Sequence, residues 1–386
     1  MLNKTIKNEV KKVMKKINVI EFFGEPLNYG GQEAFIINIY SKIDKSKFEF
    51  TFITPFECKN EKLKKMIKEN GDHLIADNQK FDSKFRKKSI IKTAKKYINN
   101  NYSIIHIHSG SIFTLYNVAK ISKERQVNKV IVHSHATGIN NIKYRLIKKI
   151  TDKSFSKYAD EFLACSEDAA KWKFPKKIIK NNKYIIIKNG IDLEKFKFNK
   201  NIRNEYRKKL KVEDKIVMCN VGRFSKEKNQ DFVIDVFHNY QKTNNAFLML
   251  IGGNGDNEEE INKKIEQLNL KDKVLILKNI DNVSDYLQAS DVFLFPSLFE
   301  GLGIVAIESQ TIGLPIICSE NIPKDVYLTN ICRMHYINEN VNIWCDEIDD
   351  LRKMDRVSNI DVISSKGYNI YSSVKNIEKI YIGEKN

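Results

Sequence analysis

The sequence contains no run of about 18 or more apolar residues, the minimum for a helix that spans a membrane. The basic N-terminal stretch, residues 1–20, also lacks the apolar middle of a signal peptide. We therefore expect a cytoplasmic protein. Met14 begins a more typical opening for a first β-strand, so residues 1–13 are either a tail or the result of a misplaced start site.

Cysteine, glycine and proline are scarce. The six cysteines form no C-x-x-C pair and no metal-finger spacing, and Cys165, Cys219 and Cys318 lie in apolar strand contexts where small core residues are expected. The 16 glycines and 6 prolines, beside abundant lysine, asparagine and isoleucine, indicate a compositional bias of the source genome. Neither a long low-complexity linker nor a short repeat is present in the sequence.

Acidic residues are fewer than basic residues. The chain has 66 Lys and Arg against 48 Asp and Glu, a formal net charge of +18 that favours anionic partners. We rank three explanations: lysines on solvated helix faces first, association with an anionic membrane surface second, and nucleic-acid binding a distant third. The lysines spread along the helical stretches 87–96 and 143–157, and no helix-turn-helix, RNP or zinc pattern accompanies them.

Strand-like apolar runs alternate with helical stretches, and the alternation begins twice. The first series of runs covers residues 17–23, 48–53, 103–108, 129–134, 161–166 and 184–192, and the second covers residues 216–222, 246–253, 273–278, 291–296 and 315–319. This pattern predicts an α/β fold of two Rossmann-like domains with parallel sheets that face each other across a cleft. A lysine-rich stretch at 197–209 separates the two series, and the length of 386 residues suits two domains.

We place the domains at residues 1–195 and 196–360. The last stretch, 361–386, has helical spacing over 367–381. Because ligands of doubly wound sheets bind at the carboxyl ends of the strands, we expect the chemistry in the cleft between the two domains.

The most informative segment runs from Asp291 to Ser319 and predicts a strand, a glycine-containing loop, a helix and a second strand. Backbone N–H groups of Gly301, Leu302 and Gly303 precede the helix. Unpaired amides and the helix dipole favour an anion such as a pyrophosphate at this position.

Two carboxylates flank these amides, since Glu300 precedes them and Glu308 stands eight positions further along. Carboxylates beside a phosphate would repel it, so sugar hydroxyls are their natural partners. For a single glutamate, a solvated surface position is the ordinary alternative.

The sequence of residues 299–319, FEGLGIVAIESQTIGLPIICS, contains two glutamates separated by seven residues. It resembles the signature with this spacing in glycosyltransferases of the GT-B architecture, in particular the large retaining family 4. The resemblance implies that Glu300 and the loop amides hold the donor sugar and that Glu308 binds the nucleotide ribose. It also implies an acceptor-binding first domain, a nucleotide-sugar-binding second domain, and a C-terminal helix that packs back on the first.

Two cations lie between a predicted strand and an amphipathic helix. Arg223 offers a fixed fork of donors and Lys228 a mobile point charge, which together suit a doubly charged leaving group. Residues 222–229 resemble the G-R-x-x-x-x-K-N segment of the family, which implies a grip on the donor pyrophosphate.

Two glycine turns have weaker parallels in the family. Gly30 and Gly31 resemble a G-G-x-E loop near the donor phosphate, although a plain helix N-terminus with Glu33 as dipole partner is the alternative. Gly252 resembles a turn near the nucleotide, where a simple tight turn is the alternative. The resemblance also places residues 280–283 near the base.

Histidines occupy alternate positions in two pairs, His106 with His108 and His133 with His135, a geometry that can present metal ligands. No third ligand at suitable spacing accompanies them, so we predict no metal site. The resemblance implies that His135, or alternatively His133, contacts the donor sugar. Because no Asp-x-Asp element is present, we also expect no metal requirement and no other cofactor.

The predicted reaction is the transfer of a sugar from a nucleotide sugar to a hydroxyl of a glycan or a polyprenyl-diphosphate-linked acceptor, with retention. Residues 164–174 and 337–348 resemble enzymes that build capsular or exopolysaccharide units on a lipid carrier, while residues 323–336 depart from the wider family. Such an acceptor would place the protein peripherally on the inner face of the cell membrane. Two alternatives stay open: a nucleotide-sugar epimerase of the same architecture, and a non-enzymatic basic protein that binds membranes or nucleic acid.

Overall fold

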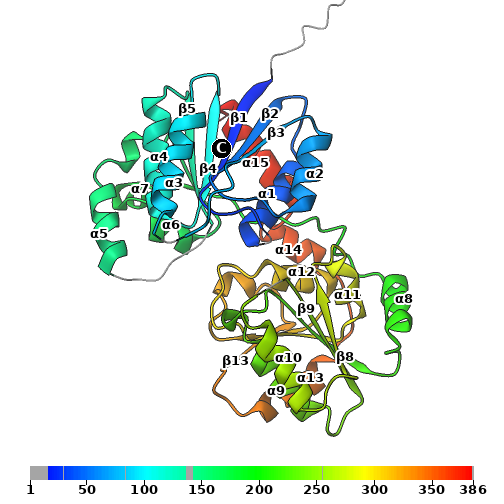
Figure 1. Cartoon of the computed structure of the whole chain (residues 1–386). Coiled ribbons are helices and arrows are strands. Elements are labelled where there is room, and N and C mark those ends of the chain that lie inside the picture. The colour runs from blue at the N-terminus through cyan, green and yellow to red at the C-terminus, as the bar shows by residue number, and fades with distance from the viewer. Residues whose placement is uncertain (1–15, 29, 83, 136–141, 254, 385–386) are drawn as a thin grey trace, which may run out of the picture.

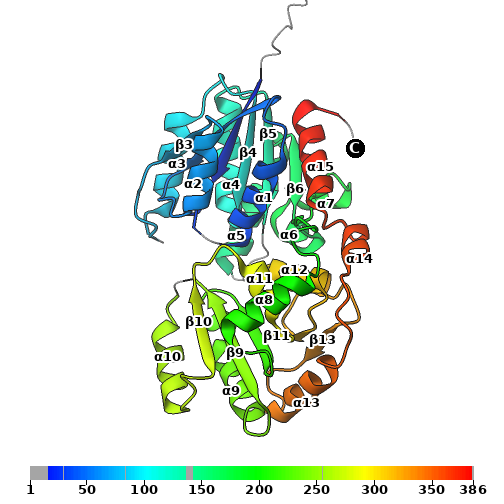
Figure 2. The same cartoon turned by 90° about the vertical axis from the view of Figure 1, so that its right-hand side faces the viewer.

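The computed structural model describes residues 16–28, 30–82, 84–135, 142–253 and 255–384 (Figure 1). They form two domains, each built on a parallel sheet with helices packed against it (Figures 1 and 2). The predicted α/β class with two Rossmann-like halves is confirmed. The expectations about Met14 and the residues before it lie outside the described residues.

The first domain has a seven-stranded parallel sheet in the order β3-β2-β1-β4-β5-β6-β7. Its strands are β1 (Ile17–Phe23), β2 (Phe48–Thr54), β3 (His73–Ala76), β4 (Ile104–Ser109), β5 (Lys129–Ser134), β6 (Glu161–Ala164) and β7 (Ile185–Ile186). Its helical elements are α1 (Gly31–Lys42), α2 (Glu61–Glu69), α3 (Arg86–Tyr97), α4 (Ile112–Glu124), α5 (Ile142–Thr151), the 3-10 turn η1 (Phe155–Lys157), α6 (Glu167–Lys173) and α7 (Lys176–Lys180). Both faces are buried, since Ile105 and Ile107 join one apolar cluster and Ile104 joins the other.

The second domain has a six-stranded parallel sheet in the order β10-β9-β8-β11-β12-β13. Its strands are β8 (Ile216–Val221), β9 (Ala246–Gly252), β10 (Val274–Lys278), β11 (Val292–Phe295), β12 (Ile316–Ser319) and β13 (Cys332–His335). Its helical elements are α8 (Lys200–Leu210), the 3-10 turn η2 (Lys226–Lys228), α9 (Gln230–Tyr240), α10 (Glu258–Gln267), α11 (Val283–Ala289), α12 (Ile304–Ile312), the 3-10 turn η3 (Lys324–Val326) and α13 (Val341–Leu351).

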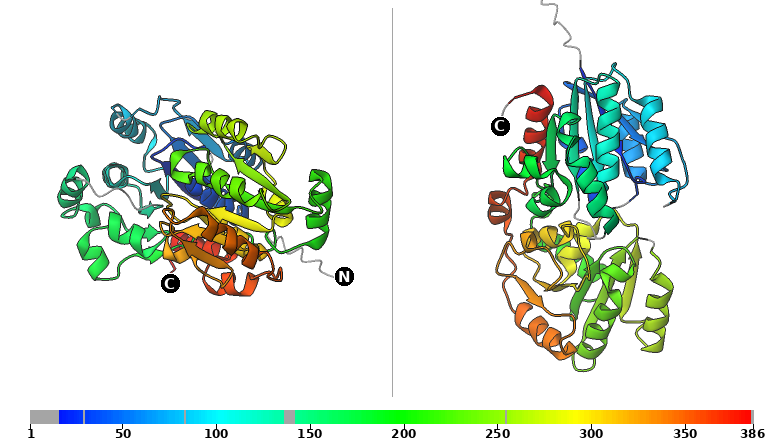
Figure 3. Two further views of the ribbon diagram at one scale, coloured as in Figure 1. Left: turned by 90° about the horizontal axis from the view of Figure 1, so that it is seen from below. Right: turned by 90° about the vertical axis from the view of Figure 1, so that its left-hand side faces the viewer.

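Strand order reverses between β1 and β4 in the first sheet and between β8 and β11 in the second. Such a reversal point separates the crossover connections and leaves room for a ligand beyond the carboxyl ends of the strands. The loops after β1, β8 and β11 carry residues that the sequence singled out. Figure 3 shows the two sheets with their flanking helices from two further sides.

The chain returns to the first domain at its end, through α14 (Ile360–Ser365) and α15 (Ile370–Ile382), drawn in red in Figures 1 and 2. Helix α15 lies against α1 and buries one apolar face in the first domain. The buried residues of that face are Ile370, Val374, Ile377, Ile380 and Tyr381. The predicted closing helix that packs back on the first domain is therefore confirmed.

One local expectation was wrong. The predicted strand over 184–192 is only the two residues of β7, because the chain leaves the sheet to pass beneath α15, where a Cβ on Gly190 would lie 2.7 Å from the Cα of Ile370. The lysine-rich stretch at 197–209 contains helix α8, whose N-terminus the side chain of Asn199 caps. Helix α8 packs against α11 and belongs to the second domain.

Candidate active site

The carboxyl ends of the two sheets meet where the loop after β11 approaches the end of β5. A Cβ placed on Gly301 would lie 4.0 Å from the backbone oxygen of His135. The charge of Arg223, in the loop after β8, also lowers the pKa of Glu33 in α1 against the larger upward effect of burial. The structure thus brings the glutamate loop, the histidine strand and the glycine turn of the first domain to one junction.

Lys228 and Glu300 form an ion pair within this junction. The same carboxylate accepts a hydrogen bond of 2.9 Å from the hydroxyl of Ser297. Only 7% of the Glu300 side chain is exposed, against 21% for Lys228. A carboxylate this buried needs a partner, and the ammonium group supplies it.

Two hydrogen bonds hold the loop of Lys228 and the loop of Glu300 together. The amide of Leu298 donates to the carbonyl of Glu227 over 2.8 Å, and the side chain of Asn229 donates to the carbonyl of Pro296 over 3.1 Å. Asn229 has φ +54° and stands at the start of α9, a left-handed conformation that asparagine tolerates. These contacts fix the position of Lys228, the residue between them.

The predicted amide donors lie at the N-terminus of α12. Gly303 caps the helix with φ +76°, and a Cβ there would lie 2.9 Å from the ring of Phe295, so the position requires glycine. The amides of Gly301, Leu302 and Gly303 have no hydrogen-bond acceptor among the residues that the structure describes. They are available to an anion, and the positive end of the helix dipole favours one.

Glu308 is half-buried in the second turn of α12. Burial raises the pKa of its carboxyl to about 7, while the charge of Lys195 lowers it. No hydrogen bond joins this carboxylate to another described residue. It is therefore able to accept hydrogen bonds from the hydroxyl groups of a ligand.

The glycine turns have different surroundings. Gly30 precedes α1, and a Cβ on Gly31 would meet no atom within 4 Å, which leaves the backbone open to a ligand. Gly252 is enclosed instead, since a Cβ there would lie 2.1 Å from the backbone oxygen of Gly222. It supports the backbone that leads into Arg223, whose side chain is exposed. The neighbours Tyr29 and Asn254 lie outside the described residues.

The four histidines of β4 and β5 lie together in the first domain. His106, His108 and His133 are buried, and His135 is half-buried at the end of β5. Ring nitrogens of the three buried residues lie within 4.8 Å of one another, close enough to hold a metal ion. The rings also pair among themselves, His106 with His133 at 3.1 Å and His108 with His135 at 2.8 Å.

Comparisons with known proteins agree with this geometry. Residues 29–195 match the family described as Glycosyltransferase Family 4, and residues 201–353 match Glycosyl transferases group 1. The chain is 26% identical to the putative glycosyltransferase EpsF of Bacillus subtilis over 328 residues, 83% of this chain and 84% of that protein. The chain belongs to the GT-B glycosyltransferases. The resemblance noted in the sequence is confirmed.

Two further relatives are informative about this glycosyltransferase. It is 27% identical over 311 residues to the Escherichia coli UDP-Gal:alpha-D-GlcNAc-diphosphoundecaprenol alpha-1,3-galactosyltransferase, covering 76% of this chain and 79% of the relative. Its fold matches Anabaena Alr3699/HepE, solved with UDP and glucose, with a TM-score of 0.71 and 18% identity over 95% of this chain and 99% of HepE. The structural match establishes the fold alone.

The sequence did not point to some polar residues in or near the candidate site. Ser297 contacts Glu300, and Glu25 follows β1 with one carboxylate oxygen buried and unpaired. Burial raises the pKa of Glu25 to about 7, although the hydroxyl of Ser109 donates to it over 2.8 Å. Lys173 is buried nearby, and burial lowers its pKa to about 8. A charged residue beside an otherwise apolar strand is the only signal that the sequence offers for such positions.

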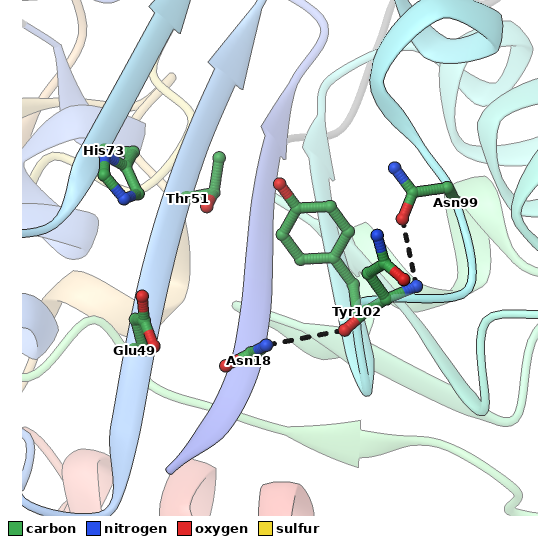
Figure 4. Close-up of a pocket in the computed structure, with 7 residues that line it drawn as sticks. Asn18, Glu49, Thr51, His73, Asn99 and Tyr102 are labelled. Atoms are coloured by element: carbon green, nitrogen blue, oxygen red, sulfur yellow. Dashed lines mark hydrogen bonds between the residues drawn. The ribbon is translucent and has the colours of Figure 1, made fainter.

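A separate pocket of about 260 Å³ lies at the other end of the first sheet (Figure 4). It is lined by residues that lie toward the amino ends of β1, β2 and β3 or precede β4: Asn18, Glu49, Thr51, His73, Asn99, Asn101 and Tyr102. The side chain of Asn18 donates to the carbonyl of Asn101 over 3.4 Å across it. Because the amino ends of the strands face away from the junction, this pocket is not part of the candidate site.

No helix within the described part of the glycosyltransferase has the length and apolar character needed to cross a lipid bilayer.

Proposed function

We propose that this glycosyltransferase transfers a hexose, with retention, from a nucleotide sugar to a hydroxyl of a glycan or a polyprenyl-diphosphate-linked acceptor, in surface polysaccharide biosynthesis. The contact between Lys228 and Glu300 beside the unpaired amides of α12 is the observation that carries the proposal. Relatives named for undecaprenol-linked substrates support the acceptor class. A matching fold solved with UDP and glucose supports the donor class.

The donor diphosphate lies, in this proposal, between the two cations and the start of α12. Arg223 grips two phosphate oxygens with its guanidinium fork, and Lys228 neutralises the charge that develops on the leaving group. The amides of 301–303 complete the grip with fixed dipoles that need no rearrangement. Gly30 and Gly31 approach the phosphate from the first domain, and Gly252 supports the loop behind it.

The two carboxylates accept hydrogen bonds from hydroxyl groups of the donor. Glu300 orients the hexose in this way, and Glu308 accepts hydrogen bonds from the ribose hydroxyls. When the phosphate binds, Lys228 gives up part of its contact with Glu300. The ammonium group then contacts both the phosphate and the carboxylate that orients the sugar. His135, or alternatively His133, contacts the sugar from the first domain.

In the reaction the glycosidic bond lengthens first, and the anomeric carbon becomes oxocarbenium-like. The acceptor hydroxyl attacks from the face that the phosphate leaves, and its proton passes to a phosphate oxygen. The new bond therefore keeps the original configuration, and Glu300 forms no covalent intermediate. We propose that no metal or other cofactor is needed, because Arg223 and Lys228 neutralise the negative charge of the leaving diphosphate.

The first domain holds the acceptor. A lipid-linked acceptor places the protein at the inner face of the cell membrane, where the net charge of +18 favours an anionic surface. The protein works there from the cytoplasm as a peripheral protein.

Transfer assays with two variants test this function. Glu300→Gln and Lys228→Ala are expected to lower sugar transfer at least about 100-fold, the effect of removing a group that stabilises developing charge. Lys226→Ala is the matched control, since Lys226 is exposed in the same 3-10 turn and forms no ion pair with a described residue. Full activity of the double variant would refute the assignment.

Product analysis separates the mechanism from its alternative. Proton NMR of the glycoside is expected to show the donor's anomeric configuration in the product. Conversion of a nucleotide sugar without any acceptor would instead identify an epimerase.

A further inference from the structure

A continuous chain of buried hydrogen bonds connects the C-terminal helix to the junction of the two domains. The hydroxyl of Tyr381 donates to one oxygen of Glu21 over 2.7 Å. The other oxygen lies 2.6 Å from Nε2 of His108, whose Nδ1 lies 2.8 Å from Nε2 of His135. The hydrogen-bond chain ends at Nδ1 of His135, which is buried and has no hydrogen-bond partner among the residues that the structure describes.

Glu21 is the acidic residue of this series of hydrogen bonds, and its surroundings disfavour a charge on its carboxyl group. Glu21 is 5% exposed in the middle of β1 and forms no ion pair with a lysine or arginine of the described residues. Burial raises the pKa of its carboxyl from 4.5 to about 8, while the Tyr381 hydrogen bond and the charge of Lys45 lower it. The titratable or charged groups that face Glu21 and His108 from the surrounding elements are His106, His133, His135, Tyr381 and Lys45.

The protonation state of Glu21 determines where His135 carries its proton. A neutral imidazole has one N–H donor and one accepting lone pair. A protonated Glu21 donates to Nε2 of His108, so His108 donates from Nδ1 to Nε2 of His135, and His135 holds its own proton on Nδ1. An ionised Glu21 reverses every step and leaves a bare lone pair on Nδ1.

The second branch of the network agrees with neutral rings. Because Tyr381 donates its only proton to Glu21, Nδ1 of His106 donates to the Tyr381 oxygen over 2.7 Å. Nε2 of His106 then accepts from Nδ1 of His133 at 3.1 Å. This leaves a lone pair on Nε2 of His133, and that atom is buried without a partner in the described part of the chain. Burial holds the pKa of both rings well below 6.5.

We propose that Glu21 is a positioning residue that, when protonated, acts through His108 to present His135 as an N–H donor toward a hydroxyl of the donor sugar. The inference rests on the proposed function, in which His135 contacts the sugar. It assigns a task to the unpaired nitrogen of His135, since a buried donor without a partner costs free energy until a ligand accepts from it. Tyr381 anchors the far oxygen of Glu21 and so connects α15 to the site.

Nitrogen-15 NMR of the imidazole side chains tests the arrangement without any assay of transfer. The rings are assigned from single-histidine substitutions. At pH 7 we expect His135 and His108 to be protonated on Nδ1 in the wild type and in Glu21→Gln, because a glutamine amide donates to His108 as a protonated carboxyl does. Above pH 8 the wild type is expected to change to Nε2–H, while Glu21→Gln stays as it is.

Two outcomes of that measurement would overturn the proposal: Nε2–H on His135 of the wild type at pH 7, or the same change with pH in Glu21→Gln. Near-stoichiometric metal in the purified protein would also overturn it, because a metal ion bound by His106, His108 and His133 would take the lone pairs on which the chain depends.

Kinetics gives a second, independent readout. Glu21→Met fills the space without a donor, and we expect kcat to fall about tenfold, the effect of one neutral hydrogen bond, with nucleotide affinity unchanged. We expect the wild type to lose rate above pH 8, whereas Glu21→Gln is expected to keep kcat at pH 7 and to show no such loss. Identical pH profiles for wild type and Glu21→Gln would reduce Glu21 to a structural residue. If the wild type transfers no sugar at all, the proposed function fails, while the NMR measurement still decides the tautomers.

Discussion

At the scale of single residues, the junction combines charges that are paired with charges that are not. Glu300 has a lysine and a serine as partners, whereas Glu308 has neither. The first is therefore held in one place before a ligand arrives, and the second is free to meet one. This difference suits a site in which a fixed carboxylate orients the sugar and an unpaired carboxylate binds the ribose.

The pH dependence of stability gives a prediction for Glu21. Its pKa rises from 4.5 in the unfolded chain to about 8 in the folded one. Between these values the folded protein keeps a proton that the unfolded chain has lost, so the free energy of unfolding falls as the pH rises. Glu21→Gln does not titrate, and its stability relative to the wild type is expected to increase with pH by up to about 1.4 kcal/mol per unit.

Urea unfolding of both proteins between pH 5 and pH 8 measures this difference. The buried histidines give the opposite dependence, because burial lowers their pKa values, but they are present in both proteins and cancel. A stability difference that is constant with pH would show that Glu21 is ionised in the folded protein.

At the scale of elements, two glycines at the ends of strands and helices differ in their surroundings, which allows a matched test. Gly252→Ala places a methyl group against the carbonyl of Gly222 and is expected to destabilise the protein by about 3 kcal/mol or more, since overpacking against backbone forces it to shift. Gly31→Ala meets no atom and is expected to leave the unfolding midpoint unchanged. Equal midpoints for the two variants, measured by thermal unfolding, would contradict the described turn.

The sequence predicted most elements, and the reasons for its failures are physical. Runs such as residues 216–222 and 246–253 are apolar because both faces of a parallel sheet are buried, so they are visible without a structure. The run at 184–192 opens with apolar residues in the same way, but the burial of Ile187 comes from α15, far along the chain. Helix α8 was not visible as an apolar run because it is highly charged and packs against the domain only on one side.

The candidate site was predictable only in part. Motif residues such as Lys228 and Glu300 stand in register with a family pattern, so their positions were named in advance, and their roles stay predictions. The partnership of Glu21 with His108 and Tyr381 depends on the pairing of β1 with β4 and on the return of α15, neither of which local sequence encodes.

At the scale of the whole molecule, a positively charged protein meets its acceptor at a membrane in our proposal. We expect the purified protein to co-sediment with vesicles that contain anionic phosphatidylglycerol, and this binding to weaken several-fold between 0.05 M and 0.5 M salt, because salt screens exposed charges. Vesicles of neutral phosphatidylcholine are the control. Equal binding to both vesicle types would exclude an electrostatic attachment.

The central claim is that two domains hold an activated sugar by its diphosphate, with an acidic side chain on the hexose. Calorimetric titration of the wild type, Lys228→Ala and Glu300→Gln with a panel of nucleoside diphosphates and their sugars tests it most directly. We predict that one nucleotide binds the wild type and binds Lys228→Ala at least about tenfold more weakly, the loss of a charged contact. Glu300→Gln is predicted to keep the nucleotide affinity and to lose the gain in affinity from the sugar. If no nucleotide or nucleotide sugar binds, or if all three proteins bind them alike, the claim is contradicted.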